Sequence, residues 1–150
     1  MPSRRELLAG AVAFPVLADA QQAAPLFSAA ELELIRDLAE TIIPRTETPG
    51  AADAKVHLYN DRALSHKPAA EAAAFRQGLA IAAAAVKQGK SHTALLTELS
   101  DAKAPFFKQL KDLTIDGYYS SKEGLATELG WHGYSALPEF KGCTHKEHQD

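Results

Sequence analysis

The sequence predicts an all-α fold, a small helical bundle-like domain that ends in an irregular, aromatic-rich segment. Apolar residues recur at helical spacings of three and four through the middle of the chain. No alternating apolar and polar run bounded by turn residues is present, so a β-sheet is not expected. The 150 residues are one domain's worth of sequence, long enough to bury a single core without disulfides or a metal.

The first helix is predicted to begin at Ser28. Glu31 follows three residues later, which is the capping-box pattern, in which each side chain accepts a hydrogen bond from the other residue's backbone N–H. Pro44 ends this helix, because the residue before a proline is disfavoured in the helical region. One apolar stripe is expected to face the core, formed by Leu32, Ile35, Ala39 and Ile42.

Four further helices are predicted before residue 120. A loop that contains Pro49 and Gly50 precedes the second helix, which is predicted over 51–64 and could start later, at Asp53. The next follows Pro68, stops at Gly89 and carries a stripe of Phe75, Leu79, Ala82 and Val86. A short helix is expected over 91–99. The last begins at Pro105 and carries a stripe of Phe106, Leu110, Leu113 and Gly117.

From Ser120 onward, glycines and a proline break the helical pattern, and aromatic residues lie between them. We therefore expect residues 28–119 to form the helical domain and residues 120–150 to pack irregularly on it or on a partner. Aromatic residues are enriched in protein interfaces. The candidate partner contacts are Tyr118, Tyr119, Trp131, Tyr134 and Phe140.

Residues 1–20 have the pattern of an export signal that is not part of the fold. A basic start is followed by a weakly apolar, alanine-rich stretch that is too short to span a bilayer. The start is similar to a twin-arginine translocation signal, with Arg4, Arg5, Leu7 and Leu8 as its key residues. Ala18 and Ala20 mark a signal-peptidase site, and residues 21–27 read as a linker. The alternative is a basic helix start before an alanine-rich segment.

Charge and composition exclude several classes of function. The net charge of −3 does not favour a nucleic-acid partner, which requires concentrated positive charge. The chain has no glycine-rich nucleotide-binding motif and no haem-attachment motif. His57 stands alone in a helical segment, where a hydrogen-bonded packing role is expected.

The only cysteine, Cys143, leaves two interpretations open. In an exported protein an odd cysteine favours a disulfide with another chain, while a free thiol is the alternative. Together with His145 and His148 it also offers thiolate and imidazole ligands for zinc or copper. That spacing matches no standard closed site. A freestanding periplasmic metal-binding protein is therefore the second hypothesis.

The C-terminal half carries a series of distinctive motifs, which are Phe106-Phe107, Leu113-Thr114-Ile115-Asp116-Gly117-Tyr118-Tyr119, Gly130-Trp131-His132-Gly133-Tyr134 and Leu137-Pro138-Glu139-Phe140-Lys141-Gly142-Cys143-Thr144-His145. This series resembles the gluconate 2-dehydrogenase subunit 3 family. The opening helix, which ends in Thr41-Ile42-Ile43-Pro44, is also similar to that family's first helix.

The resemblance implies a non-catalytic accessory subunit with no cofactor of its own. The family's partner is a large subunit that binds FAD and oxidises a sugar or sugar acid, and a multihaem cytochrome c subunit often passes the electrons to the membrane. The small subunit supplies the twin-arginine signal that the translocase reads. It also supports folding and stability of the large subunit. The implied location is the periplasm, with membrane association through partner subunits.

Overall fold

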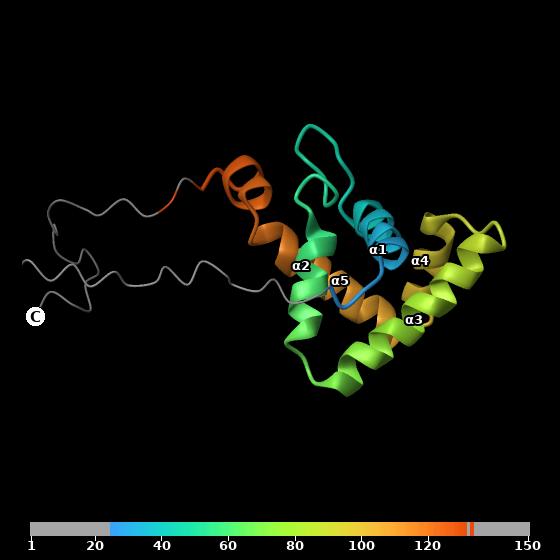
Figure 1. Cartoon of the computed structure of the whole chain (residues 1–150). Coiled ribbons are helices and arrows are strands. Elements are labelled where there is room, and N and C mark those ends of the chain that lie inside the picture. The colour runs from blue at the N-terminus through green and yellow to red at the C-terminus, as the bar shows by residue number, and fades with distance from the viewer. Residues whose placement is uncertain (1–24, 132, 134–150) are drawn as a thin grey trace, which may run out of the picture.

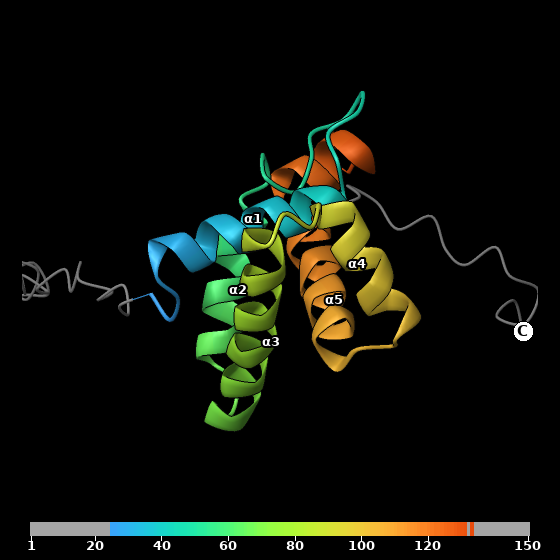
Figure 2. The same cartoon turned by 90° about the vertical axis from the view of Figure 1, so that its right-hand side faces the viewer.

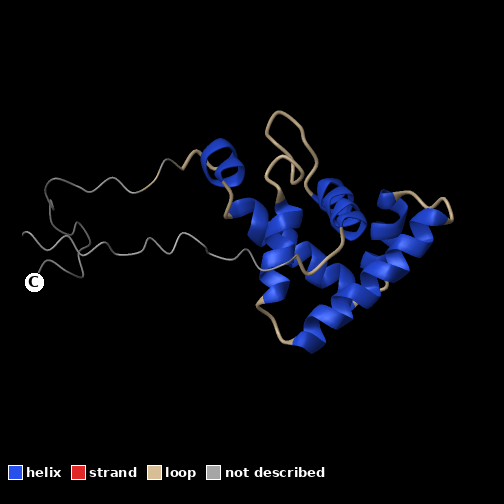
Figure 3. Cartoon of the chain, viewed as in Figure 1, coloured by secondary structure: helices blue, strands red, loops and turns tan. Residues whose placement is uncertain are grey.

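The structure, a computed structural model, describes residues 25–131 and 133. Within this part of the chain every regular element is a helix (Figure 1, Figure 3). The all-α prediction is confirmed. The elements are α1 (Ala29–Ile42), α2 (Val56–Ser65), α3 (Ala69–Lys87), α4 (His92–Asp101), α5 (Pro105–Tyr119) and the short π-helix η2 (Glu123–Glu128).

Helix α5 is the centre of the arrangement, since it contacts α1, α2, α3, α4 and η2. Helix α1 lies across one end of the other helices, as Figure 2 shows. The connection 43–55 and η2 lie at that same end, beyond α1 (Figure 2). The fold thus has a packed body and, past α1, an end built from non-helical chain and one helical turn.

The helix ends follow the local signals in the sequence. Ser28 Oγ accepts from the Glu31 N–H at 3.4 Å, and Glu31 Oε2 accepts from the Ser28 N–H at 2.8 Å, so the capping box is present. At the end of α3, Gly89 has φ +90° and its N–H donates to Val86 O, while Lys90 N–H donates to Ala85 O. This is the Schellman motif, which satisfies the last carbonyls of a helix.

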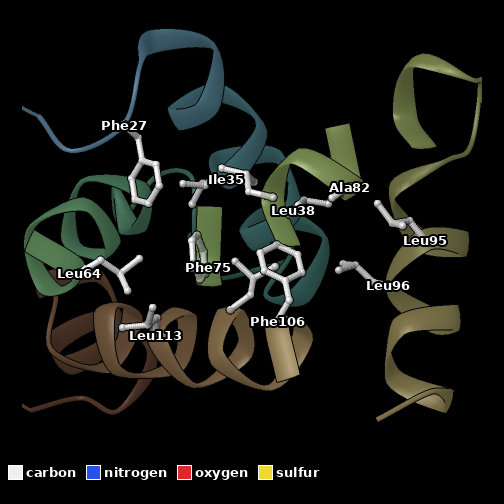
Figure 4. Packing of buried hydrophobic residues seen from close by; sticks show 12 residues of the cluster. Phe27, Ile35, Leu38, Leu64, Phe75, Ala82, Leu95, Leu96, Phe106 and Leu113 are labelled. Carbon is white, nitrogen blue, oxygen red and sulfur yellow. The ribbon is translucent and has the colours of Figure 1, made fainter. Parts of the chain in front are cut away.

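The predicted stripes supply most of the core, but Leu32, Ile42 and Val86 are only partly buried, and Leu38, which lies outside the predicted stripe, is fully buried. Three phenylalanines from distant parts of the chain pack against one another in tilted pairs, with ring centroids 5.7 Å apart for Phe27 and Phe75 and 5.1 Å apart for Phe75 and Phe106. Figure 4 shows Phe75 and Phe106 between α1 and α5, with Ile35 and Leu38 of α1 above them. Buried side chains around them come from all five α-helices: Ile35, Leu38, Leu64, Phe75, Leu79, Ala82, Leu95, Leu96, Phe106, Leu110 and Leu113.

The linker predicted over 21–27 extends too far. Phe27 is 1% exposed and belongs to the core. Its N–H donates to Asp61 Oδ1 at 2.9 Å, and the Arg76 guanidinium lies 5.1 Å from its ring centroid. A single aromatic residue in a short segment that contains a proline gives no periodic signal, so only the folded structure assigns it to the core. Residues 21–24 lie outside the described residues.

The helix predicted over 51–64 begins later, at Val56. Residues 51–54 form one turn that ends at Lys55, whose φ is +54°. The Val56 N–H donates to Ala51 O and the Lys55 N–H to Ala52 O, so a Schellman-type stop precedes α2. Lysine carries no signal for this left-handed conformation, which explains why the sequence pattern runs through the break.

One buried polar residue joins α2 to α5. Asn60 is fully buried, and in the orientation that satisfies its amide, the side-chain nitrogen donates to Leu113 O at 3.1 Å and to Val56 O at 3.2 Å. Nearby, Gly117 lets α2 approach α5 closely, because a Cβ there would lie 2.8 Å from the Tyr59 ring. The position of α2 against α5 is therefore fixed by both packing and hydrogen bonding.

Candidate functional site

The connection 43–55, called here the α1–α2 loop, is held in place by a side chain of α1. Glu40 lies near the end of that helix and its two carboxylate oxygens accept from the backbone N–H groups of Arg45 and Ala52, each at 2.8 Å. The N–H of Ala51 also donates to Ile43 O at 2.9 Å. These bonds close the base of the loop, which brings its two ends together against α1.

A second set of bonds lies within the loop. The Arg45 guanidinium makes a bidentate pair with Asp53, with Nε–Oδ2 at 2.7 Å and Nη2–Oδ1 at 2.5 Å. The Gly50 N–H donates to Asp53 Oδ2 at 3.0 Å. The Arg45 hydrogen bond and then the Gly50 N–H lower the pKa of Asp53, so this carboxylate stays charged at neutral pH. Gly50 is required here, because a Cβ would lie 2.6 Å from the backbone nitrogen of Arg45 and 2.4 Å from a Glu40 oxygen.

Tyr118 of α5 ties the loop to the rest of the fold. Its ring is 1% exposed and lies in a second apolar cluster with Ala39, Ala51 and Val56. Its hydroxyl donates to Pro49 O at 2.6 Å. Burial raises the pKa of this phenol, so it remains a protonated donor over the physiological range. Pro49 is therefore bonded to α5, while Glu40 bonds Arg45 and Ala52 of the same loop to α1.

The carbonyl of the same residue holds the chain that follows α5. Tyr118 O accepts from the Ser121 N–H at 3.0 Å and from Ser121 Oγ at 2.6 Å, and Ser121 Oγ accepts from the Gly124 N–H at 3.1 Å. A Cβ at Gly124 would lie 2.2 Å from Tyr118 O, so only glycine allows this approach. We call the α1–α2 loop together with residues 119–131 the loop end.

Large apolar side chains are exposed on the loop end. Tyr119 is 40% exposed, Leu129 61% and Trp131 44%. They lie on either side of η2, whose presence modifies the prediction of an irregular segment from residue 120: Glu123–Glu128 is helical. The Trp131 N–H donates to Leu125 O at 2.8 Å, which turns the chain back onto this helix.

The structure divides the predicted partner contacts. Tyr119 and Trp131 are accessible on the loop end. The prediction for Tyr118 needs correction, because its ring is buried within this chain and its hydroxyl is bonded to Pro49. The two tyrosine rings contact each other edge to face, with centroids 5.2 Å apart, yet only Tyr118 is buried, since successive helix residues point about 100° apart. Tyr134 and Phe140 lie outside the described residues.

Most other predicted site residues also lie outside the described residues. They comprise the proposed export signal at Arg4, Arg5, Leu7 and Leu8, the proposed cleavage site at Ala18 and Ala20, and the tail residues Cys143, His145 and His148. The interpretations of these residues therefore stay predictions. The bonding roles of Glu40, Arg45, Asp53 and Pro49 were not predicted, because an acidic side chain that caps a distant loop has no fixed spacing in sequence.

His57 differs from its expected role. Its side chain is partly buried on α2, but Nδ1 is buried without a hydrogen-bond partner. Burial lowers the pKa of this imidazole, and the positive charge of Arg36 lowers it further. A neutral ring with an unsatisfied nitrogen is a small stability defect rather than a hydrogen-bonded packing contact.

Residues 25–131 and 133 contain neither a metal-ligand cluster nor a membrane-spanning helix. In that part of the chain no group of three or more His, Cys, Asp or Glu side chains is placed to hold a metal ion. None of its helices is long and apolar enough to cross a membrane. A groove of about 530 Å³ lies between α1 and α3, but alanine and leucine dominate its lining, with Glu31 and Lys87 as its charged members. It is an apolar hollow without a convergent set of reactive groups.

Comparison with known proteins gives one match. The family model of gluconate 2-dehydrogenase subunit 3 matches residues 29–98 and 84–135, which together take in all six helices and most of the loop end. No curated protein and no solved structure matches the chain significantly. The match covers well over half of the chain, and it includes both the loop and Tyr118 that form the site described above. The chain belongs to the gluconate 2-dehydrogenase subunit 3 family.

Proposed function

We propose that this chain is the small, non-catalytic subunit of a periplasmic FAD-dependent sugar or sugar-acid dehydrogenase. The flavin-bearing large subunit carries out the oxidation, and this chain supports its folding, stability and export. The family match over residues 29–135 is the observation that carries the proposal, because that family is one of dehydrogenase subunits. The exposed Tyr119 and Trp131 on the loop end support it, since aromatic side chains are favoured anchors in protein interfaces.

The export role explains why the leader precedes a chain without a nucleotide-binding motif. The twin-arginine route transports folded proteins, so a flavoprotein can acquire FAD in the cytoplasm and travel out with a partner that carries Arg4 and Arg5. The twin-arginine translocase is then a transient partner. A multihaem cytochrome c subunit is the proposed link of the complex to the membrane.

A charge-conserving change in the leader tests the export role. In Arg4→Lys, Arg5→Lys we expect dehydrogenase activity to be lost from the periplasm and to accumulate in the cytoplasm. Arg62→Lys is the matched control, because Arg62 is exposed on α2 and far along the chain from the leader. Undiminished periplasmic activity in the double variant would show that the large subunit leaves the cytoplasm without this signal.

Cys143 is proposed to form a disulfide with the large subunit, since an oxidising compartment and an odd cysteine favour pairing between chains. On a non-reducing gel of the purified complex we expect this chain to migrate with the large subunit and to separate after reduction. The Cys143→Ser variant should migrate alone in both lanes. A wild-type chain that always migrates alone would exclude the covalent link.

A further inference from the structure

We infer that the α1–α2 loop is a preformed contact element for the flavin-bearing subunit, and that Tyr118 is the residue that positions it. The inference rests on the proposed function and goes beyond it by naming a surface. It starts from the length of the loop. Thirteen residues, 43–55, join two helices that contact each other directly, whereas connections between packed helices usually need about 2–8 residues. The body of the fold does not require the extra chain.

Hydrogen bonds hold four backbone groups along the loop. Glu40 accepts from Arg45 and Ala52, Asp53 accepts from Gly50, and Tyr118 donates to Pro49. The stretch between Arg45 and Pro49 is called the loop tip, and Thr46 and Glu47 are exposed on it. A long loop without such bonds would lose conformational entropy when a partner orders it. Here the fold orders it in advance, which is how preorganised elements gain affinity.

The position of the loop supplies the second argument. Figure 2 shows the loop and η2 together beyond α1, away from the helical body. Tyr118 bonds to the loop through its hydroxyl, which donates to Pro49, and its carbonyl accepts from Ser121, whose Oγ in turn accepts from the Gly124 N–H of η2. The exposed side chains of Tyr119, Leu129 and Trp131 therefore stand at a fixed place relative to the loop tip. Aromatic anchors beside an ordered polar rim are typical of protein interfaces.

The charges on the loop end favour a protein partner. The loop carries two cations, Arg45 and Lys55, and two anions, Glu47 and Asp53. Residues 119–131 carry one cation and two anions. This balance gives no positive patch of the kind that binds nucleic acid or an anionic membrane surface. Since the chain belongs to a family of dehydrogenase subunits, the flavin-bearing subunit is the occupant that we assign.

Site-specific crosslinking of the intact complex tests the assignment. A photoreactive benzoylphenylalanine is placed at Thr46 on the loop tip, and in the control at Ile81, which is 67% exposed on α3. The tagged full-length chain is purified with its partners from its own host. We expect Thr46 to crosslink to the FAD-containing subunit, identified by mass spectrometry, and Ile81 not to crosslink to it.

The outcomes separate the inference from the proposed function. If the FAD-containing subunit co-purifies but Thr46 crosslinks only to a haem subunit, to a second copy of this chain or to nothing, the inference is wrong and the proposed function stands. If no FAD-containing subunit co-purifies, the proposed function fails and the inference fails with it.

Binding measurements with two pairs of variants give the second test. Thr46→Trp adds bulk at the exposed tip and should weaken binding of the FAD-containing subunit at least about 10-fold, while Thr97→Trp on exposed α4 should not. Tyr118→Phe releases Pro49 without emptying the core and should weaken binding about 3- to 10-fold. Thr114→Val is its control, because it removes a buried hydrogen bond of α5, Thr114 Oγ1 to Leu110 O, that does not reach the loop. Equal binding by Tyr118→Phe and Thr114→Val would exclude a positioning role.

Discussion

The hydroxyl of Tyr118 donates a hydrogen bond of 2.6 Å to the carbonyl oxygen of Pro49, 69 residues earlier in the chain. This bond joins the last turn of α5 to the α1–α2 loop. The backbone carbonyl of the same tyrosine accepts from Ser121 at the start of the following segment. One buried residue therefore links two stretches of non-helical chain at one end of the molecule. Each stretch would otherwise be joined to the body only through its neighbouring helices.

Removal of that hydroxyl should destabilise the isolated chain. In Tyr118→Phe the ring still fills the second apolar cluster, but Pro49 O loses its donor, so we expect the free energy of unfolding to fall by about 1 kcal/mol. Urea unfolding at neutral pH measures this change. Tyr119→Phe is the matched control. Its residue is 40% exposed, so the loss of the hydroxyl there should change the free energy of unfolding little. Equal stabilities of the two variants would contradict the assigned bond.

A left-handed lysine is a position where glycine should stabilise the fold. Lys103 has φ +50° at the end of α4, where its N–H donates to Ser100 O and the Ala104 N–H donates to Leu99 O. This Schellman motif favours glycine, because a Cβ costs about 1 kcal/mol in the left-handed region. We expect Lys103→Gly to raise the free energy of unfolding by about 0.5–1 kcal/mol, as measured by urea unfolding.

The corresponding change inside a helix should have the opposite sign. Lys111→Gly lies at an exposed position of α5 and should lower the free energy of unfolding by about 1 kcal/mol, because glycine has low helix propensity. A loss of stability in both variants would mean that Lys103 does not adopt the left-handed conformation in solution.

Alanine at position 78 should destabilise the fold although it favours helix formation. A Cβ at Gly78 would lie 2.4 Å from Cγ of Phe106, whose ring packs against Phe75. The gain of about 1 kcal/mol in helix propensity is smaller than the cost of about 1–3 kcal/mol for overpacking a core. We expect a net loss of up to about 2 kcal/mol in the free energy of unfolding, measured with urea. Gln77→Ala, at an exposed neighbouring position, should change the stability by less than about 0.5 kcal/mol.

His57 should make the stability depend on pH. Burial, and then the charge of Arg36 and to a smaller degree Lys55, hold its pKa below the ordinary 6.5 in the folded chain, and Glu33 partly opposes them. The unfolded chain therefore binds the proton more readily, so the free energy of unfolding decreases as the pH falls below about 6.5. Above that pH both states are neutral at this residue and the effect vanishes.

The pH dependence can be checked with one variant. Urea unfolding of wild type and His57→Gln between pH 5 and 7 should show a smaller slope in the variant. The lowered pKa values of Glu31 and Asp53 affect stability only in a more acidic range, below their ordinary values of 4.5 and 3.8. Identical slopes for the two proteins would show that the imidazole of His57 titrates alike in the folded and unfolded chains.

The sequence by itself determined the features that depend on neighbours along the chain. The capping box of Ser28 and Glu31 needs only a spacing of three residues, and the stop at Gly89 needs only one glycine after a helical stripe. The buried stripes of α1, α3 and α5 follow from the helical period. The family resemblance, carried mainly by residues 106–145, also agrees with the family match.

Only the tertiary structure decided which residues meet across long separations. It placed Phe27 in the core and buried Tyr118 while leaving Tyr119 exposed. It started the helix predicted over 51–64 only after Lys55, whose φ is positive, and it bonded Glu40 to the backbone of the α1–α2 loop. The physical reason is the same in each case. Helical periodicity and caps are set by residues three or four apart, whereas burial and loop hydrogen bonds depend on which helices pack together after the chain has folded.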